Sequence, residues 1–129
     1  MVEALTDKTI HDAVEMWCKG GSDREAVVAR FGEIGDWNVS AVTSMEKLFW
    51  KRTDFNEDIS RWDTSNVTNM ICMFDGASSF NQPVEGWNTA NVMTMLCMFQ
   101  NASSFNQPVE GWNTANVTIM LMMFDGAPC

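Results

Sequence analysis

One stretch of this sequence occurs twice without a single change, and this repetition constrains the fold more than any other feature. The stretch covers residues 80–92 and returns at residues 105–117. A looser copy begins at Phe55 and a degenerate copy at Phe31. Self-similarity at a period of roughly 20–50 residues is typical of proteins built from stacked units. We therefore predict one continuous domain of four tandem repeats. The predicted repeats are residues 31–54, 55–79, 80–104 and 105–129.

Large apolar residues occupy fixed places within each repeat. The tryptophans recur at one constant interval, as Trp37, Trp62, Trp87 and Trp112. Valine, methionine and phenylalanine recur at the same interval, at Val67 and Val92, Met70 and Met95, and Phe74 and Phe99. Columns of like residues predict that each unit stacks on the next and that the tryptophans lie in the core rather than on a binding surface.

Two spacings inside the second repeat predict its secondary structure. Residues 67–74 place Val, Met and Phe at helical spacing, and Gly76 is of the type that commonly ends a helix. Before them, Ile59, Trp62 and Thr64 follow the spacing of a leucine-rich-repeat core. We therefore predict an α/β fold, a leucine-rich-repeat-like solenoid of four 25-residue strand–helix repeats.

The N-terminal segment, residues 1–30, does not share the repeat and predicts two short helices. Thr6 or Asp7 is the expected cap of the first helix, because either side chain can accept from the open amides of a first turn. The glycine pair at 20–21 ends that helix, and the Ser-Asp-Arg-Glu sequence at 22–25 has the form of a capping box for the second. Stacked-unit proteins need atypical end units, so we expect this segment to be an N-terminal helical cap.

The sequence Phe-Asn-x-Asp-Ile-x-x-Trp-Asp-Thr-Ser-Asn-Val-Thr-x-Met-x-x-Met-Phe-x-x-Ala, at residues 55–77, resembles the repeat of the BspA-like leucine-rich-repeat surface-protein family. That repeat, of unknown function, is noted in mycoplasma lipoproteins. The resemblance covers about residues 31–129, and it implies an array used for adhesion or protein contacts without established enzymatic activity. Pro83 and Pro108 replace the usual Asp of the family. Because proline has no backbone N–H, we expect this place to lie outside a sheet ladder.

The charge of the chain argues against a nucleic-acid partner. The net charge is −9, and no Lys or Arg follows Arg61. Nucleic-acid binding needs cations that replace the counterions of phosphates. The acidity is interpreted as a solubility feature, with a basic protein partner as the alternative.

The sequence contains no recognisable catalytic or metal-binding constellation. His11 is the single histidine, and the four cysteines lack zinc-site spacing. Cys72, Cys97 and the neighbouring methionines could be soft ligands for Cu(I), but methionine at core positions is the favoured interpretation. We therefore predict no enzyme activity, no cofactor and no metal, with the cysteines as free thiols.

The outward residues of the predicted strands form the candidate binding face. They are Asp36, Asn38, Arg61, Asp63, Ser65, Asn88 and Asn113. Such a flat, weakly charged face suits contact with a protein or a glycan better than it suits a pocketed small molecule. At the other end from the helical cap, the last repeat has no second cap after it. We expect that the chain is part of a longer one or that this end docks on a partner or another copy.

The predicted function is that of a non-enzymatic scaffold mediating protein–protein contact, alone or as a small subunit of a larger assembly. The alternative is an extracellular adhesion module that binds a host protein or a glycan. Acceptor sequences for N-glycosylation occur at Asn38, Asn66, Asn101 and Asn116, but they arise largely from the repeat itself. The first residues do not have the form of a signal peptide, which slightly favours a location inside a cell or organelle and leaves the compartment open.

Overall fold

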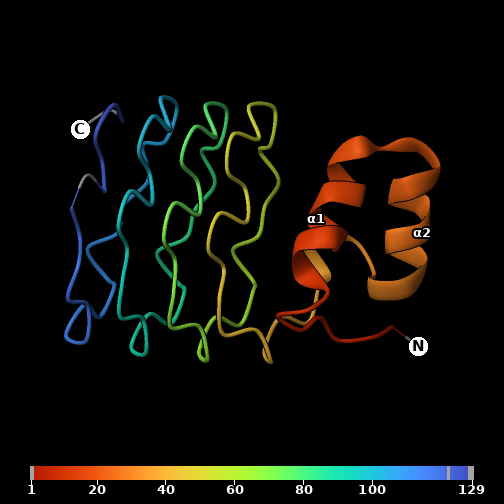
Figure 1. Ribbon diagram of the computed structural model, residues 1–129, viewed down its shortest axis with the longest axis horizontal. Helices are drawn as coiled ribbons and strands as arrows, with labels where there is room; N and C mark the ends of the chain where they lie inside the picture. Colours follow the sequence, from red (N-terminus) through yellow and green to blue (C-terminus); the bar gives the residue numbers. More distant parts are fainter. Residues whose placement is uncertain (1, 122, 128–129) are drawn as a thin grey trace.

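The computed structural model describes residues 2–121 and 123–127, and it consists of two helices followed by a stack of coils (Figure 1). α1 spans Ile10–Lys19 and α2 spans Gly21–Phe31, so the prediction of two N-terminal helices is confirmed. A short 3-10 helix, η1, follows at Ile34–Asp36. None of the helices in the described part of the chain has the length and apolar character needed to cross a membrane.

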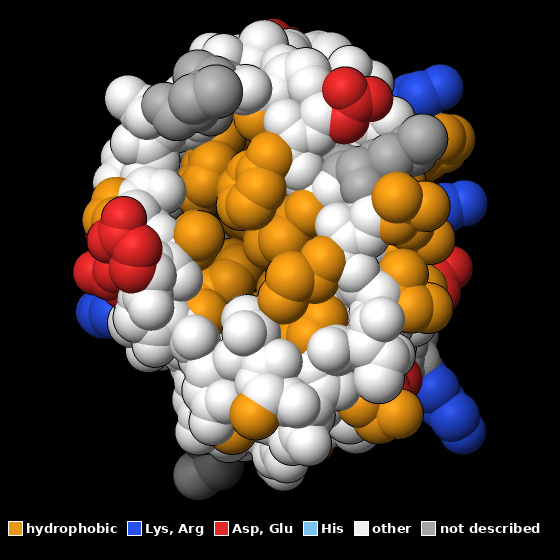
Figure 2. All heavy atoms as spheres, turned by 90° about the vertical axis from the view of Figure 1, so that its left-hand side faces the viewer, with side chains coloured by type: hydrophobic (Ala, Val, Ile, Leu, Met, Phe, Trp, Pro, Cys, Tyr) orange, Lys and Arg blue, Asp and Glu red, His pale blue; other side chains and the backbone are white. Residues whose placement is uncertain are grey.

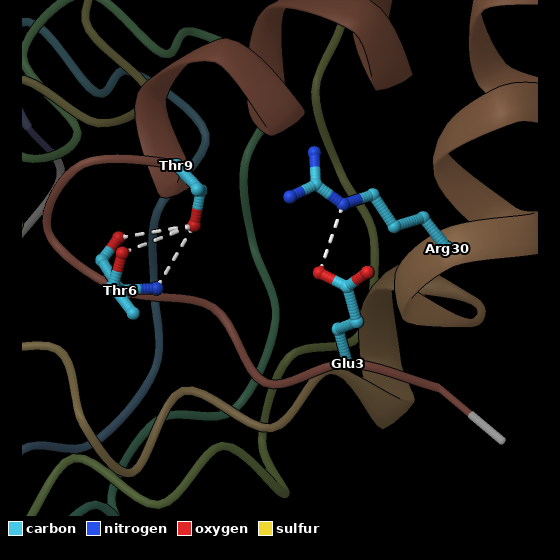
Figure 3. Close-up of polar contacts among 4 residues, drawn as sticks. All are labelled: Glu3, Thr6, Thr9 and Arg30. Atoms are coloured by element: carbon cyan, nitrogen blue, oxygen red, sulfur yellow. Dashed lines mark hydrogen bonds and ion pairs between the residues drawn. The ribbon is translucent and has the colours of Figure 1, made fainter.

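The starts of the two helices differ from the prediction. α1 has Thr9 as its N-cap residue, and neither Thr6 nor Asp7 caps it. Instead, the backbone N–H of Thr6 donates to Oγ1 of Thr9 at 2.9 Å in the turn that precedes the helix (Figure 3). α2 begins at Gly21, after Gly20 as its N-cap residue and with no side-chain cap, so the predicted capping box is wrong.

The N-terminal segment covers the first edge of the coil stack. The carboxylate of Asp7 accepts the backbone N–H groups of Thr43 at 2.8 Å and of Ser44 at 3.2 Å. The backbone N–H of Leu5 donates to the carbonyl of Asn38 at 2.9 Å. These bonds satisfy backbone groups at the edge of the first coil, which explains why Asp7 is not used as a helix cap. An ion pair of 3.0 Å between Glu3 and Arg30 also ties the leading segment to α2 (Figure 3).

The described residues after η1 form neither the predicted strands nor the predicted helices. In its described residues the backbone runs through successive turns, and the sheet pairing is limited to isolated parallel bridges. These bridges join Ser44 to Asn69, Asn69 to Thr94, and Thr94 to Ile119. The prediction of an α/β, leucine-rich-repeat-like solenoid of strand–helix repeats is therefore wrong. We keep the names unit 1 to unit 4 for the sequence segments 31–54, 55–79, 80–104 and 105–129.

The helix prediction failed because a run of turns produces a similar spacing. In unit 2 the N–H of Met73 donates to the carbonyl of Met70 at 3.3 Å, a bond across three residues. Turns of this kind direct every third side chain inward, and the i, i+3 spacing of a helix cannot be told from this pattern. The backbone conformation separates the two, because Cys72 (φ 52°) and Gly76 (φ 76°) have left-handed dihedrals that a right-handed helix excludes.

Adjacent units are joined by a ladder of backbone hydrogen bonds, most of which run from one unit to the next. In unit 1, alternate N–H groups donate to carbonyls at equivalent places of unit 2. The pairs are Met45 to Asn69, Lys47 to Ile71, Phe49 to Met73 and Lys51 to Asp75, each at 2.8 Å. Units 2 and 3 donate to the following unit in the same manner. These N–H groups point toward the C-terminal end of the stack, whereas those of Thr68, Met93 and Thr118 donate to the preceding unit at 2.8–2.9 Å.

The core is a set of aromatic columns. The rings of Phe49, Phe74, Phe99 and Phe124 stack at 5.4–5.5 Å between neighbours. The four repeat tryptophans are 3–7 % exposed, so their predicted place in the core is confirmed. Thr64, at a core place of the predicted repeat, is buried, and so is Thr89 at the same place of unit 3. Thr114, at the same place of unit 4, is exposed.

Candidate binding face

The seven residues of the predicted binding face lie at equivalent places of successive units. Six of them are exposed, and Ser65 is half-buried. One column comprises Asn38, Asp63, Asn88 and Asn113, and a second contains Asp36 and Arg61. The buried tryptophans between the two columns stack in register, at 6.0 Å for Trp37 and Trp62, which places the exposed residues along one side of the stack. We call this surface, together with the groove described below, the lateral face.

The first column has a structural role in its own backbone. Oδ1 of Asn38 accepts the Oγ–H of Ser40 at 2.6 Å and its N–H at 3.1 Å. Asp63 binds Ser65 with the same two distances. These hydrogen bonds from the Ser65 hydroxyl and N–H lower the pKa of Asp63 below its ordinary value. In units 3 and 4 the equivalent asparagines accept only the N–H of an alanine two residues later, at 3.0 Å.

The charge of the lateral face is confined to units 1 and 2. The carboxylate of Asp36 and the guanidinium of Arg61 form an ion pair of 2.7 Å, and both side chains are more than half exposed. Units 3 and 4 have Gly86 and Gly111 at the place of Arg61. An exposed pair of this kind contributes little stability, since water and salt screen it. The face therefore changes from charged side chains in its first half to small and neutral ones in its second half.

A shallow groove of about 470 Å³ forms the other part of the lateral face. It is lined by Asn66, Thr68, Asn91, Met93 and Asn116. The Nδ2 groups of the three asparagines each donate to a backbone carbonyl of the preceding unit at 2.7 Å, so this column links adjacent units. Met93 is 56 % exposed, and the sequence analysis did not single it out. The sequence did contain a signal for this residue, because unit 3 has methionine at a place where the other units have threonine.

The remaining polar groups do not assemble a catalytic arrangement within the described residues. No group of three or more His, Cys, Asp or Glu side chains there is placed to hold a metal ion. Cys18, Cys72 and Cys97 are free thiols, as predicted, and Cys129 lies outside the described residues. Burial, followed by the nearby Cys97, raises the pKa of Cys72 to about 11, which keeps this thiol protonated and unreactive at neutral pH. The core methionines Met70 and Met95 are fully buried.

A second cleft, of about 280 Å³, lies where the helices meet units 1 and 2. Its cations are Arg24, Lys51 and Arg52, which the sequence analysis did not bring together. Arg24 is held in place, because its guanidinium lies 4.4 Å from the ring centre of Trp17 and donates to the carbonyl of that residue. Acidic side chains also line this cleft, so it offers no consistent charge to a ligand.

The comparisons with known proteins give one family. The model of the family described as "Mycoplasma protein of unknown function, DUF285" matches residues 23–129. Neither the search of curated proteins nor the search of solved structures returned a match.

Proposed function

We propose that this chain, which belongs to the DUF285 family of mycoplasma proteins of unknown function, is a non-enzymatic scaffold that binds another protein through its lateral face. The observation that supports this proposal best is the ordered column of Asn38, Asp63, Asn88 and Asn113. Each of these side chains is exposed, yet each is held by a hydrogen bond to its own turn. A side chain fixed in this way loses little conformational entropy when a partner binds it.

The chemistry of the face favours a polar protein surface that carries positive charge. Its carboxylates lie in units 1 and 2, and the chain as a whole has a net charge of −9. Complementary charge on a partner increases the rate of association and discriminates against other acidic proteins. The exposed Met93 adds an apolar contact beside the asparagine column, of the type that adapts to partner surfaces.

A second candidate is an adhesion module on a cell surface, acting on a host protein or a glycan. It is supported by the resemblance of residues 55–77 to the repeat of BspA-like surface proteins. Use of the acceptor sequences at Asn66 and Asn116 would support it further, although both Nδ2 groups already donate to backbone carbonyls. Binding of the purified protein to a glycan panel, without any protein partner, would favour this candidate over the scaffold.

The test compares two variants that add the same charge at two exposed positions of unit 2 and unit 3. Gly86→Arg introduces a long cation on the lateral face, where a Cβ atom would meet nothing within 4 Å. Ser79→Arg introduces the same side chain at an exposed position outside that face. After native purification and identification of the co-purifying chains, each variant is titrated with the identified partner. We expect Gly86→Arg to weaken binding about tenfold, or about 1.4 kcal/mol, and Ser79→Arg to leave it unchanged.

Thermal melts of both variants serve as the folding control. Equal affinity of the two variants for the partner would contradict the assignment of the lateral face. Purification of the native protein without any co-purifying chain would count against the scaffold function itself.

A further inference from the structure

Unit 1 carries positive charge at places where the other units carry none. All Lys and Arg residues of the chain precede residue 62. In the view onto the last unit, such side chains show only at the outline of the molecule (Figure 2). Lys47 and Lys51 lie on either side of Trp50 in the sequence, and units 2 to 4 have neither a cation nor a tryptophan at these three places. We call Lys47, Trp50 and Lys51 the basic edge.

The two lysines of the basic edge are held against an exposed indole. Nζ of Lys47 lies 5.2 Å from the ring centre of Trp50, and Nζ of Lys51 lies 4.5 Å from it. Trp50 is 41 % exposed, whereas the tryptophans of the repeat column are buried. Ammonium groups at these distances are attracted by the electrons of the ring. The indole therefore holds two positive charges beside each other at the surface, and a ligand that binds them restricts little further side-chain motion.

Neither lysine forms an ion pair within the described part of the chain. The two ion pairs found there involve other cations. The carboxylate of Glu46, directly before Lys47 in the sequence, instead accepts a hydrogen bond of 3.1 Å from Nδ2 of Asn69 in unit 2. Two unpaired ammonium groups are thus available to an anionic ligand, in a chain whose net charge is −9.

The packing of the stack does not require cations at these places. Lys51 has a left-handed φ of 57° where units 2 and 4 have glycine, a residue that adopts this conformation more readily. Arg52 follows at the place of Ala77 and Ala102, which are 0 % exposed. Arg52 is half-buried and lines the cleft beside the helices. Unfavourable backbone conformations of this kind are commonly retained at functional sites, and Arg52 extends the positive surface toward the cleft.

The small extent of the positive charge favours a short acidic segment over a long polyanion. Glu46 precedes the basic edge, and Asp75 holds the place of Trp50 in unit 2. Asp54 lines the neighbouring cleft together with Lys51. A nucleic acid or an anionic bilayer carries negative charge over a wide area, which these carboxylates repel. A polypeptide can place carboxylates on the two ammonium groups alone and present neutral residues to the surface around them.

We propose that the basic edge is a docking site for an acidic polypeptide segment of another protein. Carboxylates of that segment accept hydrogen bonds from Nζ of Lys47 and Nζ of Lys51, and an aliphatic side chain packs on the indole of Trp50. Capture of acidic segments by clusters of cations is a recurring mode of peptide recognition, and charge-assisted hydrogen bonds are among the strongest. The site consists of other residues than the lateral face, and it does not depend on the function proposed above.

The test titrates the full chain into a fluorescein-labelled synthetic peptide of alternating Glu and Ala, followed by anisotropy. A labelled peptide of alternating Gln and Ala, of equal length, is the matched ligand control. We expect the Glu–Ala peptide to bind, and the double variant Lys47→Gln, Lys51→Gln to weaken this binding about tenfold or more. The double variant Lys8→Gln, Lys19→Gln removes the same charge from exposed positions of the helical segment, and we expect it to bind like wild type.

Nuclear magnetic resonance of the isotope-labelled chain locates the bound peptide. Saturating Glu–Ala peptide should shift the indole N–H signal of Trp50 and leave the signals of the indoles that donate to buried carbonyls, those of Trp62, Trp87 and Trp112. The Gly86→Arg variant should bind the peptide like wild type, which separates this proposal from the lateral-face proposal.

Three results would overturn the proposal. They are equal affinity for the two peptides, an equal loss of affinity in the two double variants, and an unshifted Trp50 signal at saturation. Binding to vesicles of phosphatidylserine and phosphatidylcholine that depends on Lys47 and Lys51 and is tighter than peptide binding would also overturn it, since a membrane surface would then be the occupant.

Discussion

The indole N–H of Trp87 donates a hydrogen bond of 3.0 Å to the carbonyl oxygen of Ile59 in the preceding unit. Trp62 and Trp112 make the equivalent bonds to Ile34 at 2.7 Å and to Val84 at 2.9 Å. Each of these tryptophans therefore fills the core with its ring and satisfies a buried carbonyl of the preceding unit with its polar edge. The tryptophan column joins the units by two kinds of interaction at once.

Replacing Trp87 with alanine should destabilise the protein severely. The substitution removes a ring that is 3 % exposed and the hydrogen bond to Ile59. Loss of a buried tryptophan typically costs about 3–5 kcal/mol, a large part of the total stability of about 5–15 kcal/mol of a small domain. Urea denaturation followed by circular dichroism measures the change. Trp50→Ala is the control, because Trp50 is 41 % exposed, and a similar loss in both variants would contradict a specific role of the column.

The asparagine column should stabilise the stack through its amide donors. Nδ2 of Asn91 donates to the carbonyl of Ser65 at 2.7 Å. We expect both Asn91→Ala and Asn91→Asp to lower the free energy of unfolding by about 1 kcal/mol, because both remove the donor. Urea denaturation at neutral pH compares the three proteins. If Asn91→Asp were as stable as wild type, the size of the side chain and not its hydrogen bond would account for the stabilisation.

Gly76 and Gly86 differ in backbone conformation, because only Gly76 is left-handed. Gly76 has a φ of 76°, and a Cβ atom there would lie 3.3 Å from Cγ of Lys51. We expect Gly76→Ala to destabilise the protein by about 1 kcal/mol or more, from both strain and contact. Gly86→Ala is the matched control, since its Cβ would meet nothing within 4 Å and its φ is not positive, and it should be neutral or slightly stabilising. Differential scanning calorimetry should rank the two variants in this order.

The attachment of the helical segment should depend on pH through Asp7. Burial alone would raise the pKa of this carboxyl, but hydrogen bonds from the Thr43 hydroxyl and from the N–H groups of Thr43 and Ser44 outweigh it and lower the pKa. A lowered folded-state pKa contributes stability above the unfolded value of about 3.9, and that stability is lost as the pH falls through the folded value.

The variant Asp7→Asn should therefore be less stable than wild type at neutral pH, by about 1 kcal/mol from the weakened hydrogen bonds. The difference should begin to diminish below about pH 4, where Asp7 of the unfolded chain takes up a proton, and it should be lost as the pH falls through the lowered pKa of folded Asp7. Urea denaturation of both proteins at a series of pH values, from about pH 2 to about pH 7, measures the two stability curves. Parallel curves over the whole range would contradict the role of the carboxylate.

The candidate binding residues could be located from the sequence because their spacing follows the tryptophans. Asn38, Asp63, Asn88 and Asn113 each follow a buried tryptophan directly, and their exposure agrees with the alternation that the sequence analysis assumed. Their hydrogen bonds to the following turn were not predicted, since these depend on the local backbone conformation. The groove around Met93 was missed for a related reason, because it forms only when three units are stacked.

The constant interval between copies, read from the sequence alone, determined that like residues meet in columns and that tryptophan and phenylalanine form the core. Residues 1–30 lack that interval, and their glycine pair and candidate capping residues predicted a helical segment there. Only the tertiary structure decided the backbone path within each unit. Inward side chains three residues apart are compatible with a helix and with a run of turns, and the sequence pattern does not separate them.

The run of turns prevails because it leaves alternate N–H groups free to donate to the next unit, whereas a helix would use those same groups within itself. The N–H groups that donate to the next unit are set by this backbone path, which the spacing of the apolar residues does not contain.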